Sequence, residues 1–297
     1  MATALAELDR WEGVDVALGR IERRLGDMRA AAEEGGLLRT SVATHIAWVP
    51  SEWEQQAMDT LAGLAERHPS RTIVLLPQPD ADEDGIDATL SLRAFTLPES
   101  TRRICTEVIE LRLRGRRGAA PESIVAPLLI ADLPVFLRWR GLPPFGERPF
   151  EELVDLVDRL IVDSTEWPDL PEPYRQLAAI FERTAVSDIA WARTSRWRRQ
   201  LASLWPGIAE VHSIRVRGTE AQAFLLAGWL RSRLGHPVEL EHEHSDRLIG
   251  VDIDGEPAPF PPGDPPQPSD VLSEELEKLS RDPAFEDAVR AAAQLTQ

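Results

Sequence analysis

Two short segments place charged and aromatic residues directly after apolar runs. Arg138, Trp139 and Arg140 end one such run, and Asp163 and Ser164 end another. Arginine binds phosphates and carboxylates through paired hydrogen bonds, and tryptophan and arginine dominate the energetics of many interfaces. These five residues are therefore candidates for a partner or ligand surface. Core packing of the indole, and capping of the next segment by Asp163 and Ser164, are the alternatives.

A basic group stands out in an otherwise acidic chain. Arg193, Arg196, Arg198 and Arg199 lie within seven residues of one another. They could bind a phosphate or the carboxylates of a partner, and we take Arg193 and Arg196 as candidate surface residues. The alternative is a solvated helix face with acids nearby.

The motifs of common enzymes and cofactor sites are absent from the sequence. It has neither a glycine-rich phosphate loop, nor a nucleophile elbow, nor a helical pair of metal-binding histidines. His242 and His244 would share one face of a strand, but a metal site normally needs three or four ligands. Cys105 is the single cysteine, which excludes an intramolecular disulfide, and we expect it to be buried. The absence of these motifs makes an enzyme a less favoured prediction, and we expect no cofactor or metal.

The charge balance limits the classes of partner. Fifty acidic and 33 basic residues give a net charge of −17. Such a field repels nucleic acid and anionic membranes, and it favours solubility or a basic surface on another protein. The early Glu7, Asp9 and Glu12 do not resemble a secretory signal, and no apolar run reaches the roughly 18 residues that cross a bilayer. We therefore expect a cytoplasmic protein; self-association stays open.

The elements that must position these residues predict an α/β fold. The apolar runs that end at Trp139 and Val162 read as strands with one helix between them, which is a βαβ unit and implies parallel pairing. Helical spacing covers residues 1–34, and a capping box at 51–54 opens another helix. Further strands are predicted over 39–49, 72–76, 90–97 and 104–113, and further helices over 174–184 and 195–205. We expect a mainly parallel or mixed sheet with flanking helices.

A smaller unit follows Pro206 and Gly207. It begins with a strand over 212–216 and a helix from a capping box at Thr219 to Gly235. Residues 238–244 and 248–253 read as a hairpin, which makes a β-α-β-β unit. The proline-dense stretch 257–268 reads as a stiff linker to helices over 271–279 and after Asp282. The predicted domains are 1–206, 207–256 and 257–297.

Several of these segments together resemble one known family. The segments are "DLPVFLRWRG" at 132–141, "DRLIVDS" at 158–164, "DIAWAR" at 188–193 and "AGWLRSRLG" at 227–235. In this order and spacing they are similar to the OpcA family, the glucose-6-phosphate dehydrogenase assembly proteins, in its actinobacterial form. The resemblance implies a non-catalytic protein that binds this dehydrogenase of the pentose phosphate pathway and promotes its active oligomer. The redox control that cysteines give to cyanobacterial members is in doubt here, because Cys105 stands alone.

Two other functions remain open at this point. The first is a sensor or enzyme for a sugar phosphate or nucleotide, which would use a crevice near Trp139 and Asp163. The second is a scaffold whose proline-rich tail recruits a partner while the rest of the chain stays folded.

Overall fold

The computed structural model describes residues 6–39, 41–64, 69–96, 103–264 and 266–295. The chain forms two compact units. The first comprises Met1–Arg140 and Gly146–Leu160, and the second comprises Gly141–Phe145 and Ile161–Gln297. The domain boundaries predicted at 206 and 256 stay predictions, because compactness does not show which segments fold independently.

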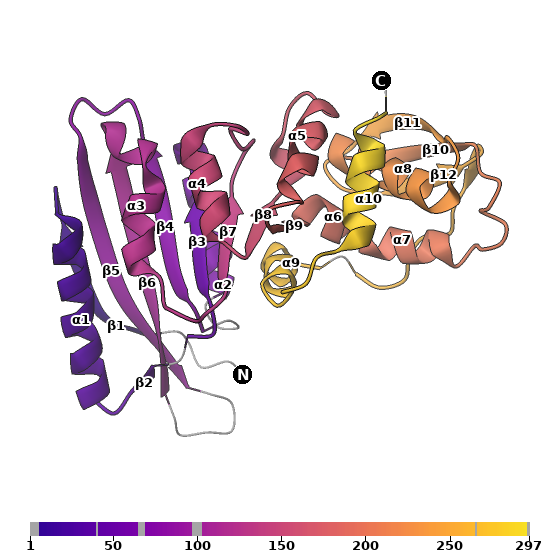
Figure 1. Ribbon diagram of the computed structural model, residues 1–297. Coiled ribbons are helices and arrows are strands. Elements are labelled where there is room, and N and C mark those ends of the chain that lie inside the picture. Colours follow the sequence, from indigo (N-terminus) through magenta and orange to yellow (C-terminus); the bar gives the residue numbers. More distant parts are fainter. Residues whose placement is uncertain (1–5, 40, 65–68, 97–102, 265, 296–297) are drawn as a thin grey trace. The chain divides into compact units, whose positions relative to one another are not determined.

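A mixed sheet forms the centre of the first unit (Figure 1). Its strands, in spatial order, are β1 (Ala6–Gly13), β5 (Gly85–Thr96), β6 (Arg103–Arg114), β4 (Arg71–Gln78), β3 (Thr44–Trp48) and β7 (Val135–Trp139). The short β2 (Leu38–Arg39) pairs with β6. Pairing is antiparallel from β1 to β6 and parallel from β6 to β7. The predicted α/β class with a mixed sheet is confirmed.

Helices cover both faces of this sheet. They are α1 (Leu18–Glu34), α2 (Glu54–Leu64), α3 (Pro121–Val125) and α4 (Arg148–Leu156), with the 3₁₀ turns η1 (Ser51–Trp53), η2 (Gly115–Ala119) and η3 (Ala126–Leu128). Met58 and Leu61 of α2 pack against a cluster that includes Ala47, whereas the next residue, Trp48, stacks on Trp139, whose ring meets Phe150 of α4. Successive side chains on a strand point to opposite faces, so α2 and α4 lie on opposite sides.

The predicted βαβ unit is present. β7 is followed by α4 and then by β8 (Arg159–Val162). The start of β8 lies beside β7, because Asp158 donates its N–H to the Val135 carbonyl at 2.9 Å. In return the Asp158 carboxylate accepts the Val135 N–H at 2.8 Å. β8 passes into the second unit after Leu160.

Two predictions at the amino-terminal end were wrong. The helix does not cover residues 6–13, which pair with β5 as β1; helical burial begins with Ile21, Leu25 and Met28. The predicted capping box at 51–54 does not form, because Ser51 lies inside η1 and the cap position falls on Pro50. Tertiary pairing and a proline therefore override the local pattern in both places.

The second unit contains the end of β8, its neighbour β9 (Ala185–Asp188) and a separate four-stranded sheet. The helical elements outside that smaller sheet are η4 (Ser164–Glu166), α5 (Glu172–Ile180), α6 (Ile189–Arg193), α7 (Ser195–Ala202), α9 (Pro268–Glu275) and α10 (Pro283–Ala292). The longer α8 (Glu220–Leu234) connects β10 to β11, two strands of the smaller sheet. β9 and α6 were not anticipated.

The predicted β-α-β-β unit is present, but the hairpin is wrong. Its sheet has the order β11 (Glu239–His244), β10 (Ser213–Gly218), β12 (Gly250–Ile253) and β13 (Glu256–Pro257). β10 separates the two strands of the supposed hairpin, pairing parallel with β11 and antiparallel with β12. The capping box of Thr219 with Gln222 and the left-handed Gly235 (φ 74°) are confirmed. The crossover through α8 therefore sets β11 beside β10.

The C-terminal helix α10 belongs to the core of the second unit. Asp282 caps it, as predicted, through the N–H groups of Ala284 and Phe285. Phe285, Ala288 and Val289 are fully buried. A Cβ on Gly228 of α8 would lie 2.3 Å from the Ala288 carbonyl oxygen, so only glycine permits this close helix contact.

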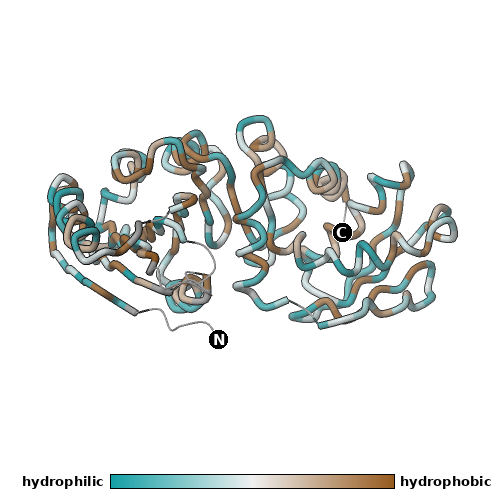
Figure 2. The backbone as a smooth tube through the Cα atoms, turned by 90° about the horizontal axis from the view of Figure 1, so that it is seen from below, coloured by the Kyte–Doolittle hydropathy of each residue, from teal (hydrophilic) through white to brown (hydrophobic). Residues whose placement is uncertain are grey.

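No described helix is both long and apolar enough to cross a membrane. Figure 2 shows hydrophobic and hydrophilic residues interleaved along the described trace. This interleaving is typical of elements that bury one face and expose the other.

Candidate functional site

The carboxyl edge of the parallel strands is the first candidate site. β3 has β4 on one side and β7 on the other, and the chain reaches those neighbours through α2 and α3, respectively. The strand order therefore reverses beside β3. Open α/β sheets bind their ligands at such a reversal, outside the carboxyl ends of the strands.

Trp139 lies at this edge but inside the protein. Its indole is 3% exposed and stacks on Trp48 with 4.7 Å between ring centroids and 8° between planes. The same indole makes a T-shaped contact with the Phe150 ring, with 5.0 Å between centroids. Aromatic pairs of this kind add to the energy of burial. Trp139 therefore holds β7, β3 and α4 together.

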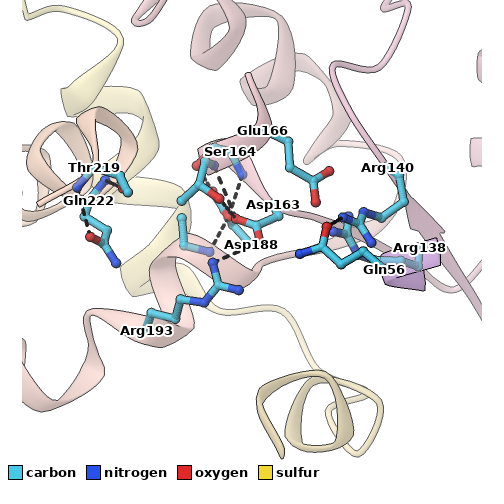
Figure 3. Close-up of polar contacts among 12 residues, drawn as sticks. Gln56, Arg138, Arg140, Asp163, Ser164, Glu166, Asp188, Arg193, Thr219 and Gln222 are labelled. Atoms are coloured by element: carbon cyan, nitrogen blue, oxygen red, sulfur yellow. Dashed lines mark hydrogen bonds and ion pairs between the residues drawn. The ribbon is translucent and has the colours of Figure 1, made fainter. Parts of the chain in front are cut away.

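Arg138 and Arg140 are buried on the α2 side of the sheet. Arg138 donates to the carbonyl of Trp139. Arg140 donates to the side-chain oxygen of Gln56 at 2.6 Å, and its guanidinium lies 4.6 Å from the ring centroid of Trp53. Figure 3 shows Arg138, Arg140 and Gln56 together. Arg140 thus links the end of β7 to the start of α2, and Arg138 binds the backbone at the end of its own strand.

A hollow of about 520 Å³ opens at the same edge, and we call it the carboxyl-edge hollow. Its apolar walls are Trp48, Pro50, Pro77 and Pro79, with Gly115, Gly118 and Ala119 of η2. Ser51, Glu52 and Asp80 supply its polar groups. Its volume lies in the range of about 300–1,000 Å³ that is typical of ligand pockets.

The rim of this hollow is acidic. Asp80, Asp82, Glu83 and Asp84 follow β4 on one exposed loop. Glu52 and Asp80 line the hollow, and we call these two residues, together with the exposed Asp82 of the same loop, the acidic rim. Asp84 accepts the N–H and Nε of Arg116, each at 2.8 Å, and these bonds lower the pKa of Asp84. Among the described residues, the three acids of the rim form no ion pair. The sequence signal for this site is the run of four acids within residues 80–84. None of these acids is among the site residues predicted from the sequence.

Gly115 fixes the acidic loop against η2. Its φ is +54°, which favours glycine, and a Cβ there would lie 2.4 Å from an oxygen of Asp84. The absence of a side chain lets the Asp84 carboxylate reach Arg116. The rim is therefore held in place beside the hollow.

A buried polar cluster in the second unit contains Asp163 and Ser164. Ser164 is fully buried and donates its hydroxyl to Asp188 at 2.6 Å, and its Oγ lies 2.9 Å from the Tyr174 hydroxyl. Asp188 also accepts the N–H groups of Ser164 and Ala190, at 3.1 and 2.8 Å. Figure 3 shows Ser164, Asp163 and Asp188 meeting at this point. The carboxyl ends of β8 and β9 bring the two aspartates together.

Burial and the neighbouring Asp163 raise the pKa of Asp188 to about 7. Burial likewise raises the pKa of Tyr174. Ser164 is no accessible nucleophile, since its side chain is enclosed and its hydroxyl proton goes to a carboxylate. The cluster therefore joins strands and caps α6 through Asp188; a substrate would not reach it in this structure.

Two of the candidate arginines, Arg193 and Arg196, bind other groups of the second unit. Arg193 pairs with Asp163 at 3.1 Å. Arg196 donates to the carbonyls of Pro261 and Pro262, at 3.0 and 2.9 Å, and to that of Gly263. The proline-rich segment thus lies against α7 through Arg196, and Phe260 adds an edge-to-face contact with Trp197 at 5.3 Å.

The histidines and the cysteine form no metal-binding cluster in the part of the chain that the structure describes. No group of three or more potential metal ligands occurs there, and His242 Nε2 lies 2.9 Å from the Gly218 carbonyl oxygen. Cys105 is buried, as predicted, and its thiol lies 3.9 Å from the Thr106 carbonyl oxygen.

Comparison with known proteins identifies the class. Residues 61–181 match a family model that describes the N-terminal domain of a glucose-6-phosphate dehydrogenase subunit. Residues 184–259 match the model that describes the C-terminal domain of such a subunit. Both are OpcA models. The chain belongs to the OpcA family of glucose-6-phosphate dehydrogenase assembly proteins.

Individual relatives come from cyanobacteria, and each is provisionally named an OxPP cycle protein, OpcA. The chain is 30% identical to that of Nostoc punctiforme over 198 residues, which are 62% of this chain and 42% of the relative. It is 26% identical to that of Synechococcus elongatus over 228 residues, 68% of this chain and 50% of the relative. The matched regions thus cover half or less of each relative's length.

Proposed function

We propose that this chain is a non-catalytic, cytoplasmic factor in the assembly or activation of glucose-6-phosphate dehydrogenase. Membership of the OpcA family supports this function. The enclosed Ser164 and the paired Asp163 give no support to a catalytic role for the predicted cluster. The net charge of −17 favours a basic protein surface over nucleic acid or an anionic membrane.

The physical mechanism is linkage between binding and oligomerisation. A protein that binds the active oligomer more tightly than the inactive subunit shifts the population toward the oligomer by that difference in affinity. A tenfold shift needs about 1.4 kcal/mol of differential binding. The chain therefore needs no chemistry of its own to activate the dehydrogenase allosterically.

The carboxyl-edge hollow is the observation that carries the docking part of this proposal. Apolar walls of tryptophan and proline suit an aliphatic or aromatic anchor. The acidic rim, whose carboxylates form no ion pair among the described residues, suits arginine or lysine on the same partner segment. The dehydrogenase would thus present a basic segment with an apolar anchor to this hollow.

The predicted crevice near Trp139 and Asp163 is the weaker candidate. Trp139 is part of the core of the first unit, and Asp163 is paired with Arg193 in the second. Within its own unit, each side chain contacts other protein groups: the rings of Trp48 and Phe150 surround Trp139, and Arg193 binds Asp163. A sensor or enzyme built on these two residues is therefore less well supported than docking at the hollow.

Light scattering coupled to gel filtration tests the proposal. The chain is mixed with glucose-6-phosphate dehydrogenase from the same genome, and the mass of each eluting species is measured. We expect a stable complex whose mass exceeds that of either protein alone. Separate peaks at micromolar concentrations, in the presence and absence of glucose 6-phosphate, would contradict the proposal. The same run on the chain alone determines whether it self-associates.

A further inference from the structure

A second hollow, of about 580 Å³, lies in the second unit between residues of α7, α8 and α9, and we call it the arginine hollow. It is lined by Ser195, Arg198, Arg199, Ala202, Trp229 and Glu274. Its volume is again typical of a small-molecule site. In contrast to the carboxyl-edge hollow, its lining carries two guanidinium groups.

Arg198 is held rigidly but without an acidic partner. Its guanidinium lies 3.3 Å from the ring centroid of Trp191, and its Nε donates to the Thr194 hydroxyl at 3.0 Å. In the described part of the chain no carboxylate comes within ion-pair distance of it. Burial lowers the pKa of Arg198 to about 10, so the group is still charged at pH 7.

Arg199 is the second cation at this place. It is exposed, and its Nε makes one long contact, 3.4 Å, with the carbonyl of Ser195. It too forms no ion pair within the described ranges. The four clustered arginines thus divide into two pairs. Arg193 binds Asp163 and Arg196 binds the proline-rich segment, whereas Arg198 and Arg199 line the hollow.

Burying an arginine without a direct ion pair is costly. The more distant charges of Asp282 and Glu275 offset only part of the desolvation of Arg198, and the pKa of its guanidinium stays lowered. In a chain of net charge −17, acids are available to pair with it. The cation–π contact and the hydroxyl bond fix its orientation instead. Such an arrangement is what an anion-binding group requires: a charged donor, already oriented, with donor capacity left over.

The other residues that line the arginine hollow favour a ligand with a ring and hydroxyl groups in addition to its anionic group. Trp229 offers an aromatic wall against which the apolar face of a ring can pack. Glu274 is a carboxylate, which repels an anion but accepts hydrogen bonds from hydroxyl groups. Ser195 adds a neutral donor. A ligand that combines a doubly charged phosphate with a ring bearing hydroxyl groups satisfies all of these groups together.

We infer that the arginine hollow binds a sugar phosphate, with its phosphate between Arg198 and Arg199, its ring against Trp229 and its hydroxyl groups toward Glu274. This inference does not depend on the proposed function, because the site belongs to the chain alone. The ligand would bind reversibly, and no bond is made or broken.

Isothermal titration calorimetry on the full chain, without the dehydrogenase, tests the site. The probes are glucose 6-phosphate, inorganic phosphate and glucose. We expect saturable binding of glucose 6-phosphate, weaker binding of inorganic phosphate, and no measurable heat with glucose. Glucose binding as tightly as its phosphate would overturn the inference, and so would the absence of binding by any probe. Equal affinity for both phosphates would overturn the sugar part.

Three variants localise the binding. Arg199→Glu, at an exposed position, should weaken glucose 6-phosphate at least tenfold without affecting folding, and Arg198→Lys should weaken it by a smaller factor. Glu274→Gln should bind inorganic phosphate about threefold more tightly, because one repelling charge is removed, with a smaller preference for the sugar phosphate. Arg215→Gln, an exposed arginine paired with Glu241 at 2.7 Å, is the matched control and should change nothing. Unchanged affinity in Arg199→Glu would place the binding elsewhere and overturn the inference.

Discussion

The two hollows of this chain differ in the sign of their charge. The carboxyl-edge hollow has tryptophan and proline walls, with Glu52 and Asp80 of the acidic rim in its lining, whereas the arginine hollow has Arg198 and Arg199 with Trp229. In each, an aromatic wall lies beside charges that have no ion-pair partner in the described part of the chain. The difference in charge agrees with the two occupants that we propose: a basic protein segment in the first unit and a sugar phosphate in the second.

The comparison also shows how each unit holds its hollow in place. In the first, a stack of Trp48 and Trp139 and the Asp84–Arg116 bonds fix the edge of a sheet. In the second, α8, which supplies Trp229 to the arginine hollow, packs closely on α10 at Gly228. Perturbing one support should therefore affect one unit first, and the following experiments exploit this.

Deletion of residues 257–297 should have the largest effect. It removes Phe285, Ala288 and Val289 from the core of the second unit. The loss should exceed the roughly 3–5 kcal/mol that truncating one buried phenylalanine costs, so we expect the second unit to unfold. Thermal unfolding followed by circular dichroism measures this.

Leu279→Ser is the control for the deletion, because Leu279 is 66% exposed and its replacement should leave the melting temperature unchanged. A deleted chain that melts like the intact one would show that the tail is a detachable recruitment segment, as the scaffold hypothesis requires.

Trp139→Ala should destabilise the first unit. The substitution removes an indole that contacts two aromatic rings, and such truncations cost about 3–5 kcal/mol. Urea unfolding gives the value. Trp205→Ala, at a side chain that is 66% exposed, should stay within about 0.5 kcal/mol of the parent. Equal effects of the two substitutions would mean that Trp139 is not a core residue.

Asp188→Asn should flatten the pH dependence of stability. Since the pKa of Asp188 is about 7 in the folded chain, against an ordinary 3.8, the folded chain binds this proton more tightly than the unfolded one. The free energy of unfolding therefore falls as the pH rises from about 4 to about 7. One pKa unit corresponds to about 1.4 kcal/mol, so the fall is on the order of 4 kcal/mol.

Urea unfolding at pH 4.5, 6 and 7.5 compares Asp188→Asn with the parent chain. The amide cannot ionise, so the contribution from residue 188 should vanish in the variant. An identical slope in both proteins would show that Asp188 is not the titrating group.

Charge reversal of the acidic rim should have the smallest effect on folding and a selective effect on binding. The triple variant Glu52→Arg, Asp80→Arg, Asp82→Arg should weaken the complex with glucose-6-phosphate dehydrogenase at least about tenfold, or about 1.4 kcal/mol, and mainly through the association rate. Surface plasmon resonance at two salt concentrations measures both. Asp246→Arg, at a fully exposed acid of the second unit, should bind as the parent does; equal losses would make the effect one of net charge.

Much of the fold follows from local sequence. The alternation that buries Ile109, Leu111 and Leu113 predicts β6, and the βαβ unit follows from two apolar runs with one helix between them. The capping box at Thr219 and the Asp282–Pro283 start of α10 depend on nearest neighbours, and both formed. These features depend on interactions between residues that are close together in the sequence, so the sequence alone predicts them.

What could not be predicted depends on contacts between distant residues. The loop 245–249 is compatible with a hairpin, and nothing within it shows that β10 occupies the place between β11 and β12. The sequence brings Trp139 to a strand end but does not say that Trp48 and Phe150 will enclose it. It shows four clustered arginines, but only the structure shows that Arg198 and Arg199 line a hollow whereas Arg193 and Arg196 do not.

The most direct test of the account is the steady-state kinetics of glucose-6-phosphate dehydrogenase from the same genome. NADPH production is titrated against glucose 6-phosphate, with and without an excess of this chain, at a fixed enzyme concentration. The account predicts a changed half-saturation for glucose 6-phosphate that follows the fraction of enzyme in the complex and is reduced in the acidic-rim variant. Identical curves, together with separate peaks in light scattering, would contradict it.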